Sequence, residues 1–210
     1  MKYFLDNVLF KIIPEYALTR LLIIVAIQFI SYSVTRLITI KKTHHSPALH
    51  IDSKIKFIPQ FIYIYISCYA YWVVNFILAA HVGVSHFDAF FRSVIIGYII
   101  GGIIFLAYPT RIDRPNVANL SGMTGKLVKL IYSIDEPTNL LPSFHCLISW
   151  YCWIAVRNCC DISAIYRIFS LFFTIIVCFS TVFVKQHFVL DAIFGIFIAE
   201  ISWQIVNLIN

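Results

Sequence analysis

Long apolar runs are the feature that most limits what this chain of 210 residues can form. They alternate with polar connections, and their approximate limits are residues 18–40, 57–79, 90–108, 144–156, 164–184 and 188–208. A helix needs roughly 20 predominantly apolar residues to cross about 30 Å of hydrocarbon, and it satisfies its own backbone polar groups there. The runs predict an all-α fold, a polytopic membrane bundle of about six transmembrane helices, in which the fourth helix is short.

Composition excludes the ordinary soluble classes of protein. Hydrophobic residues make up 60% of the chain and charged residues only 12%, and the mean hydropathy is +0.86. A soluble domain is typically about half apolar and about a quarter charged. The 17% aromatic content also argues against a disordered chain. The six cysteines fall mostly inside apolar runs, which indicates small core residues and no disulfide framework.

The net charge of +6 comes from lysines and arginines that are scattered between the apolar runs, with no dense basic tract. This pattern favours anionic lipid headgroups or a lipid phosphate over nucleic acid as the partner, and it leaves the oligomeric state open. Residues 1–17 are interrupted by Asp6, Lys11 and Pro14, so they lack the unbroken apolar stretch of a secretory signal. We expect an interfacial segment at 1–17 and one six-span domain over 18–210.

The connections between the runs differ in length and character. We expect a basic, histidine-bearing loop at 41–56, short turns at 81–88, 157–161 and 185–187, and a long polar connection at 109–143. Within the long connection, Lys126 and Lys129 are spaced as on one helix face among apolar residues, over the range 125–133. That spacing predicts a short amphipathic helix on the membrane surface, although an ordinary loop with solvated lysines fits equally well.

Polar residues gather in three segments, and such groups near hydrocarbon usually serve a function because they are costly there. The segments are Tyr-Pro-Thr-Arg-Ile-Asp-Arg-Pro at 108–115, Leu-Pro-Ser-Phe-His at 141–145, and Ser-Thr-Val-Phe-Val-Lys-Gln-His-Phe-Val-Leu-Asp at 180–191. With six spans, the connections after the third and fifth spans lie on the same side of the membrane. The span count therefore predicts that all three segments meet at one site.

His187 and Asp191 are the most specific pair in these segments. They are four residues apart at the start of an apolar helix, so the carboxylate can orient one imidazole nitrogen and leave the other free. Gly195 continues that face and lets a neighbouring helix approach closely. Taken alone, such a pair is more often structural than catalytic.

Pro142, Ser143 and His145 stand where the fourth helix begins. A helix start offers free backbone N–H groups and the positive end of the dipole, which suit an anion. The serine hydroxyl adds a donor, and the histidine adds a group that transfers protons. A capped helix start that carries an interfacial histidine is the simpler interpretation of this segment alone.

Arg111, Arg114 and Lys185 supply positive charge around the two histidines. Guanidinium groups present paired donors to phosphate oxygens, although such arginines also anchor proteins on lipid headgroups. Two histidines, a carboxylate and several cations together favour phosphoryl transfer through a phosphohistidine, with no metal and no cofactor. A zinc site is disfavoured because the three histidine-bearing loops offer no Cys or His pair at ligand spacing beyond the adjacent His44 and His45.

These motifs resemble those of the type 2 phosphatidate phosphatase superfamily, the integral-membrane lipid phosphate phosphatases. That family is identified by K-x6-R-P, P-S-G-H and S-R-x5-H-x3-D. The chain matches at Arg114-Pro115, at Pro142-Ser143-Phe144-His145 with Phe for Gly, and at Ser180, His187 and Asp191, and the resemblance covers roughly residues 50–210. Ala107 and Thr181 replace the motif lysine and arginine, and Arg111 and Lys185 are close enough in sequence to restore the charge. The Tyr-Pro-Thr before Arg114-Pro115 and the Ser-Thr that opens the third motif are similar to the branch that includes inositol phosphorylceramide synthases.

The resemblance implies a role for each matching residue. His187 would attack phosphorus, Asp191 would orient it, and His145 would protonate the leaving alcohol and then activate the acceptor. Arg114 would hold the phosphate with help from Ser143 and Ser180. It also implies a cell inner membrane or an endomembrane, with both termini in the cytoplasm and the site on the extracytoplasmic or lumenal face, which the distribution of basic residues does not settle.

The expected activity is metal-independent hydrolysis of a lipid phosphate monoester or pyrophosphate. Two alternatives stay open: a lipid headgroup phosphotransferase of the inositol phosphorylceramide or sphingomyelin synthase kind, and a non-catalytic six-span transporter or lipid binder. Glu200 lies about half a turn away from the face of His187 and Asp191, so we interpret it as a packing residue.

Overall fold

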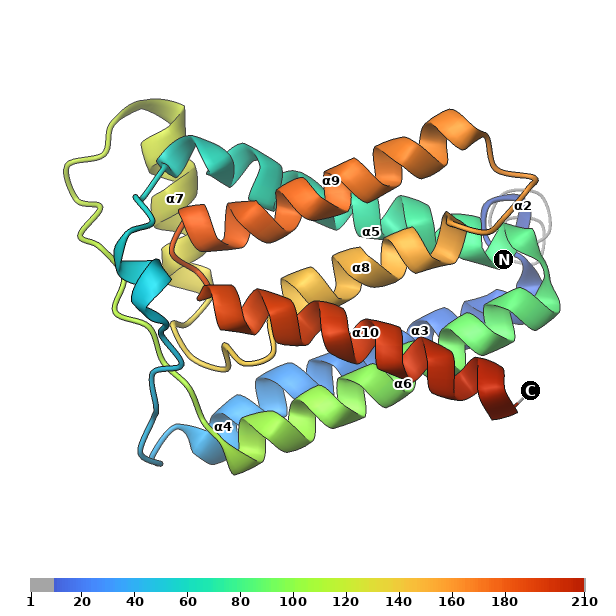
Figure 1. Ribbon diagram of the computed structural model, residues 1–210, viewed down its shortest axis with the longest axis horizontal. Helices are drawn as coiled ribbons and strands as arrows, with labels where there is room; N and C mark the ends of the chain where they lie inside the picture. The colour runs from blue at the N-terminus through green and yellow to red at the C-terminus, as the bar shows by residue number, and fades with distance from the viewer. Residues whose placement is uncertain (1–9, 210) are drawn as a thin grey trace.

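Helices account for nearly all the regular structure of residues 10–209, the part of the chain that this computed structural model describes (Figure 1). The longer elements are α3 (Glu15–Phe29), a π-helical segment (Ile30–Val34), α4 (Thr35–Thr39), α5 (Ile62–Val82), α6 (Val84–Ala107), α7 (Gly122–Ile134), α8 (Phe144–Val156), α9 (Ala164–Phe183) and α10 (Val189–Ile209). The short helices are α2 (Phe10–Ile12) and two 3₁₀ turns, His50–Ser53 and Pro59–Phe61.

Five helical stretches within the described residues are long and apolar enough to cross a membrane. They are Glu15–Thr39, Pro59–Val82, Val84–Ala107, Ala164–Phe183 and Val189–Ile209. Large apolar side chains such as Phe172 and Phe197 are exposed on their outer surfaces, as expected where lipid is the solvent. With the shorter apolar helix α8, they form the predicted polytopic helical bundle, and the chain is an integral membrane protein.

Helix α8 lies in the centre of this bundle and packs against α5, α6, α9 and α10 (Figure 1). Ten of its 13 residues are buried. At 1.5 Å per residue it is about 20 Å long, shorter than the hydrocarbon layer. Because the other helices surround it, the loop that precedes α8 is buried in protein, and this position carries His145 into the bundle.

The prediction of a turn at 81–88 was wrong, because the connection between α5 and α6 is much shorter. Only Gly83 separates the two helices, and its φ of 144° is in a region that favours glycine. Helix α6 therefore begins at Val84, six residues before the predicted start. Its polar first turn is accommodated because Asp88 forms a 3.0 Å ion pair with Arg20 of α3.

The amphipathic helix predicted at 125–133 is confirmed as α7, which is slightly longer. Val128 and Ile131 are buried against Tyr65 of α5, whereas Lys126 is exposed. Lys129 is held by the chain, since its Nζ donates to the carbonyls of residues 118 and 120 at 2.8 and 2.9 Å. One face of α7 thus covers the end of the bundle.

The first membrane helix is continuous from Glu15, but its hydrogen-bond pattern widens to a π-helix between Ile30 and Val34. Such segments leave a backbone carbonyl free for other partners. The side chain of Asn139, in the long connection, donates to the carbonyl of Tyr32 at 2.9 Å and to Thr35 Oγ1 at 3.1 Å. The π-helical segment is thereby joined to the loop that leads to His145.

The connections that carry the polar segments lie at one end of the bundle, while α3 begins and α10 ends at the other (Figure 1). This arrangement is the one that six spans require. Of the predicted interfacial segment at 1–17, residues 1–9 lie outside the described residues. Its remainder forms α2 and the first turn of α3.

Candidate active site

The three polar segments meet at that end of the bundle. The rings of His145 and His187 face each other with centroids 5.9 Å apart and planes tilted by 56°. Arg114, from the long connection, donates a hydrogen bond through Nη2 to Gln186 Oε1, next to His187 in the chain. The structure therefore brings both histidines and the motif arginine into one cluster.

His187 lies in the connector between α9 and α10, within the short turn predicted at 185–187 and just before the start of α10. The backbone N–H groups of Gln186 and His187 both donate to the carbonyl of Thr181, at 2.9 and 3.2 Å, which folds the connector back on α9. The side chain of His187 is only 5% exposed. The sharp return of the chain is completed by Lys185, whose φ is 55°.

Asp191 faces His187, as the four-residue spacing predicted. Its Oδ2 lies 3.5 Å from His187 Nδ1, within ion-pair range but beyond a normal hydrogen bond. The same oxygen accepts the backbone N–H of Phe188 at 2.8 Å, and so caps the start of α10. The carboxylate thus both closes the connector and lies beside the imidazole.

Ser143 links the two histidine-bearing segments through its backbone. Its N–H donates to the carbonyl of Asp191 at 2.9 Å, and its Oγ accepts the N–H of Cys146 at 3.4 Å as the N-cap of α8. A Cβ on Gly195 would lie 2.6 Å from the Ser143 carbonyl oxygen. The prediction that Gly195 permits close helix packing is confirmed.

Aromatic side chains of α5 surround the outer side of His145. The ring of Tyr65 lies 4.5 Å from the imidazole and that of Trp72 lies 5.4 Å from it, centroid to centroid. The hydroxyl of Tyr69 is 3.3 Å from His145 Nε2. The ring contacts fix the plane of the imidazole, and the contact with the Tyr69 hydroxyl fixes the direction of its Nε2.

Arg114 is held in place by the last turn of α7. Its Nη1 donates to the carbonyl of Asp135 at 2.6 Å, and its guanidinium lies 4.7 Å from the centre of the Tyr132 ring. Burial raises the pKa of Tyr132 to about 12, against the opposing effect of Arg114. The neutral phenol donates to the carbonyl of Val184 at 2.8 Å, which attaches α7 to the connector.

Several buried polar atoms of this cluster have no hydrogen-bond partner in the described part of the chain. They are Arg114 Nε, Gln186 Nε2, His187 Nδ1 and Asp191 Oδ1. Buried polar groups in proteins are almost always satisfied, so these unpaired atoms are candidates to bind water, an ion or a polar ligand. The guanidinium and amide nitrogens suit an anion with several oxygens.

The other expected phosphate ligands are placed differently. Lys185 Nζ donates to the carbonyls of Asp52 and Ile55, at 3.3 and 2.6 Å, and so holds the 50–58 segment. Arg111 is exposed, and its backbone N–H pairs with the carbonyl of His45. Ser180 is buried in α9, where its Oγ donates to Val177 O at 2.7 Å.

Sequence reasoning missed Asp135, Gln186 and Asn139. Asp135 accepts hydrogen bonds from Tyr32 at 2.7 Å and from Tyr65 at 3.3 Å, and lines the same cavity as His145. Gln186 lies inside one of the polar segments, but an uncharged residue between Lys185 and His187 gave no separate signal. Asp135 carried only the signal of a carboxylate at the end of the amphipathic helix.

A hollow region leads from His145 to the outer surface of the bundle. A cavity of about 210 Å³ beside His145 and Asp135 shares Gln28, Tyr69, Trp72 and Ile148 with an apolar cavity of about 310 Å³ between α3, α5 and α8. We call the two together the α3–α5 cleft. Its inner end is polar and its outer end is apolar, which matches an amphipathic molecule.

The fold defines a polytopic helical membrane protein with a polar cluster at one end. No protein-family model, curated protein or solved structure matches the chain. Within residues 10–209, no group of three or more His, Cys, Asp or Glu side chains is arranged to hold a metal ion.

Proposed function

We propose that the chain is a lipid phosphatase, which hydrolyses a lipid phosphate monoester or pyrophosphate through a phosphohistidine and needs no metal. The observation that carries the proposal is the facing pair of histidines, with the unpaired donors of Arg114 and Gln186 beside them. A nucleophile, an acid and an oxyanion clamp are the groups that phosphoryl transfer requires. The order and spacing of the matching motifs support the same activity.

In the first step, Nε2 of His187 attacks phosphorus while Nδ1 faces the carboxylate of Asp191. A nitrogen–phosphorus bond forms, the bond from phosphorus to the lipid oxygen breaks, and His145 gives its proton to that oxygen. In the second step, His145 removes a proton from water, whose oxygen attacks phosphorus and releases His187 and inorganic phosphate. Arg114 neutralises charge on the phosphoryl oxygens in both steps.

The α3–α5 cleft supports a lipid as the substrate. Its polar end contains His145, the proposed proton donor to the leaving alcohol, and its apolar end lies among membrane helices. A lipid with its chain in the cleft would have its phosphate at His145, whose ring lies 5.9 Å from that of His187. We place the enzyme in a cell inner membrane or an endomembrane, with the site on the extracytoplasmic or lumenal face, in line with the resemblance.

The test is a panel of lipid phosphates incubated with the wild-type protein and with His187→Ala in detergent micelles. We expect release of inorganic phosphate by the wild type only. Substrate labelled in its phosphate should leave an acid-labile label on the wild type, and also on His145→Ala at a lower rate. An unchanged rate of phosphate release in His187→Ala would refute the proposal, and no release by the wild type from any lipid of the panel would favour the transporter or lipid-binder alternative.

Headgroup transfer is the second candidate, and one observation favours it. The cavity beside His145 is lined by Asp135 and several aromatic residues, a surface that suits a hydroxyl-bearing or cationic alcohol better than a phosphate dianion. Such an alcohol would take the place of water in the second step. Turnover that depends on an added lipid alcohol, with a phosphodiester product, would establish this activity in place of hydrolysis.

A further inference from the structure

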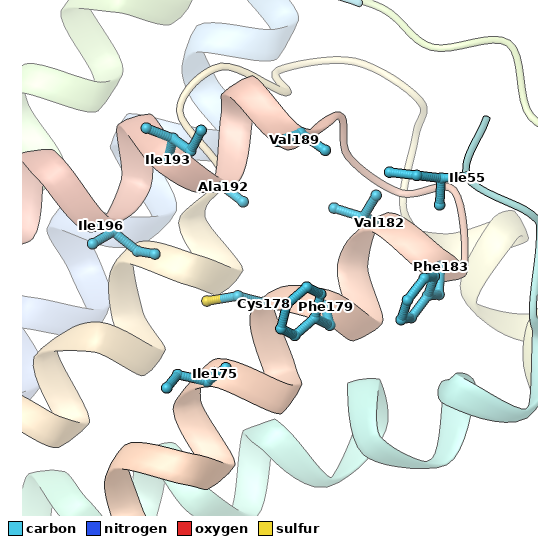
Figure 2. Close-up of a pocket in the computed structure, with 10 residues that line it drawn as sticks. All are labelled: Ile55, Ile175, Cys178, Phe179, Val182, Phe183, Val189, Ala192, Ile193 and Ile196. Atoms are coloured by element: carbon cyan, nitrogen blue, oxygen red, sulfur yellow. The ribbon is translucent and has the colours of Figure 1, made fainter. Parts of the chain in front are cut away.

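A second hollow region lies on the other side of the bundle, between α9 and α10. It measures about 380 Å³ and is lined almost entirely by apolar atoms, with Ile55, Phe179, Val182, Val189 and Ile193 among its residues. Figure 2 shows these side chains on both sides of the space between the two helices, with Ile55 at one end. We call this region the α9–α10 groove.

Hydrocarbon is the medium that meets this groove, because α9 and α10 are both membrane-spanning helices. Phe179 and Ile193 are 55% and 51% exposed, so the groove opens on the outer surface of the bundle. It shares no lining residue with the α3–α5 cleft. An acyl chain in the groove would therefore occupy a position separate from the substrate proposed above.

Two exposed lysines stand in the chain on either side of the residue at one end of the groove. Ile55 closes that end, and its neighbours in the chain, Lys54 and Lys56, are both exposed. The segment belongs to the connection at the active-site end of the bundle, the level at which phospholipid headgroups lie. Lysines near a membrane surface attract anionic headgroups, by about 1 kcal/mol each, which corresponds to about fivefold in affinity.

The wall at this end of the groove is also the chain that positions His187. Asp52 Oδ1 accepts the N–H of Val189 at 2.9 Å, Lys185 Nζ donates to the carbonyl of Ile55, and Ile58 N donates to the carbonyl of Phe183 at 2.9 Å. These bonds join the 52–58 segment to both ends of the connector that contains His187. A molecule packed against Ile55 and Val189 therefore stabilises the arrangement of that connector.

We propose that the α9–α10 groove binds an anionic phospholipid other than the substrate, with one acyl chain between the helices and the headgroup phosphate at Lys54 and Lys56. Bound lipid stabilises the native protein because it binds only the folded state, and the contacts with Ile55 and Val189 extend that stabilisation to the connector of His187. The site gives the protein a preference for membranes rich in anionic lipid. It does not depend on any particular reaction at the histidines.

The experiment measures lipid retention by the purified full-length protein, by native mass spectrometry after exposure to phosphatidylglycerol or phosphatidylcholine with matched chains. We expect the wild type to retain phosphatidylglycerol in preference. The double variant Lys54→Gln/Lys56→Gln should lose at least fivefold of that preference. The control variant Lys41→Gln/Lys126→Gln removes two exposed charges from segments that do not line the groove, and should keep the preference.

Two further variants distinguish this site from the others. Ile193→Trp fills the mouth of the groove and should reduce retention of both lipids, whereas Arg114→Gln, in the candidate active site, should leave retention unchanged. Equal retention of the two lipids by the wild type would overturn the proposal. So would a preference that is lost in Arg114→Gln but persists in Lys54→Gln/Lys56→Gln, because the lipid would then lie at the active site.

Discussion

Gly195 is the position at which the smallest change should have the largest effect on the site. A methyl group there would lie 2.6 Å from the carbonyl oxygen of Ser143 and 3.0 Å from the backbone nitrogen of Leu147. Both atoms belong to the backbone at the start of α8, so no side-chain rotation relieves the contact. The start of α8 must instead move away from α10 by about 0.8 Å to restore an ordinary separation near 3.4 Å.

Gly195→Ala has two expected consequences. Overpacking of this kind costs about 1–3 kcal/mol, which lowers the melting temperature by about 2–4 °C for each kcal/mol in a chain of this size. The displacement also moves His145 away from His187, and a misplacement near 1 Å costs up to about 10²-fold in rate. We therefore expect kcat for lipid phosphate hydrolysis to fall about ten- to a hundredfold while the protein stays folded.

Gly102→Ala is the matched control. Its added methyl group would lie 3.3 Å from Ser31 Cβ, a contact that a small shift of the first helix relieves, and neither residue lines the cavity beside His145. Thermal unfolding in detergent and initial rates of phosphate release measure both effects. Equal melting temperatures and equal rates for Gly195→Ala and Gly102→Ala would refute the reasoning from close helix contact.

Two further predictions concern carboxylates. Asp135→Asn removes the charge beside His145, while the amide oxygen can still accept the hydrogen bond from Tyr65, so we expect unchanged thermal stability. We expect kcat to fall by about tenfold, which is part of the 10²–10⁴-fold that proton transfer contributes. A kcat equal to that of the wild type would contradict a role for that charge. Glu200→Gln breaks the two-bond ion pair with Arg157 at the other end of the bundle. The melting temperature should therefore fall, by the equivalent of about 1–2 kcal/mol for this partly buried pair, with KM and kcat unchanged.

The interpretation of Glu200 shows what helical periodicity predicts well. Its position half a turn from the face of Asp191 indicated a packing role, and the structure pairs it with Arg157 and with the indole of Trp150. The six helices and the meeting of His145 with His187 follow from the same kind of reasoning. Apolar runs and span parity depend on the bilayer, which sets the same length and polarity requirement for every span.

Local polar contacts were less predictable. Lys185 has the spacing of a phosphate ligand, but nearby backbone carbonyls of the 50–58 segment satisfy its ammonium group. Asp135 gave little signal because the packing of α7 brings it to His145, and no pattern in residues 136–144 predicts that packing. The π-helical segment near Tyr32 likewise depends on a distant partner, Asn139. Each of these cases results from tertiary contacts between segments that share no sequence motif or periodicity.

The short central helix α8 has a consequence for how the protein is made. With 13 residues, α8 is too short to cross the hydrocarbon layer on its own, so its stable insertion requires the helices that surround it. Two of these, α9 and α10, are synthesised after it, and the bond from Ser143 to Asp191 can form only when α10 is in place. The arrangement of the two histidines is therefore expected only after α10 has been made, because a chain arrested before α10 contains both histidines but not the bond that joins their segments.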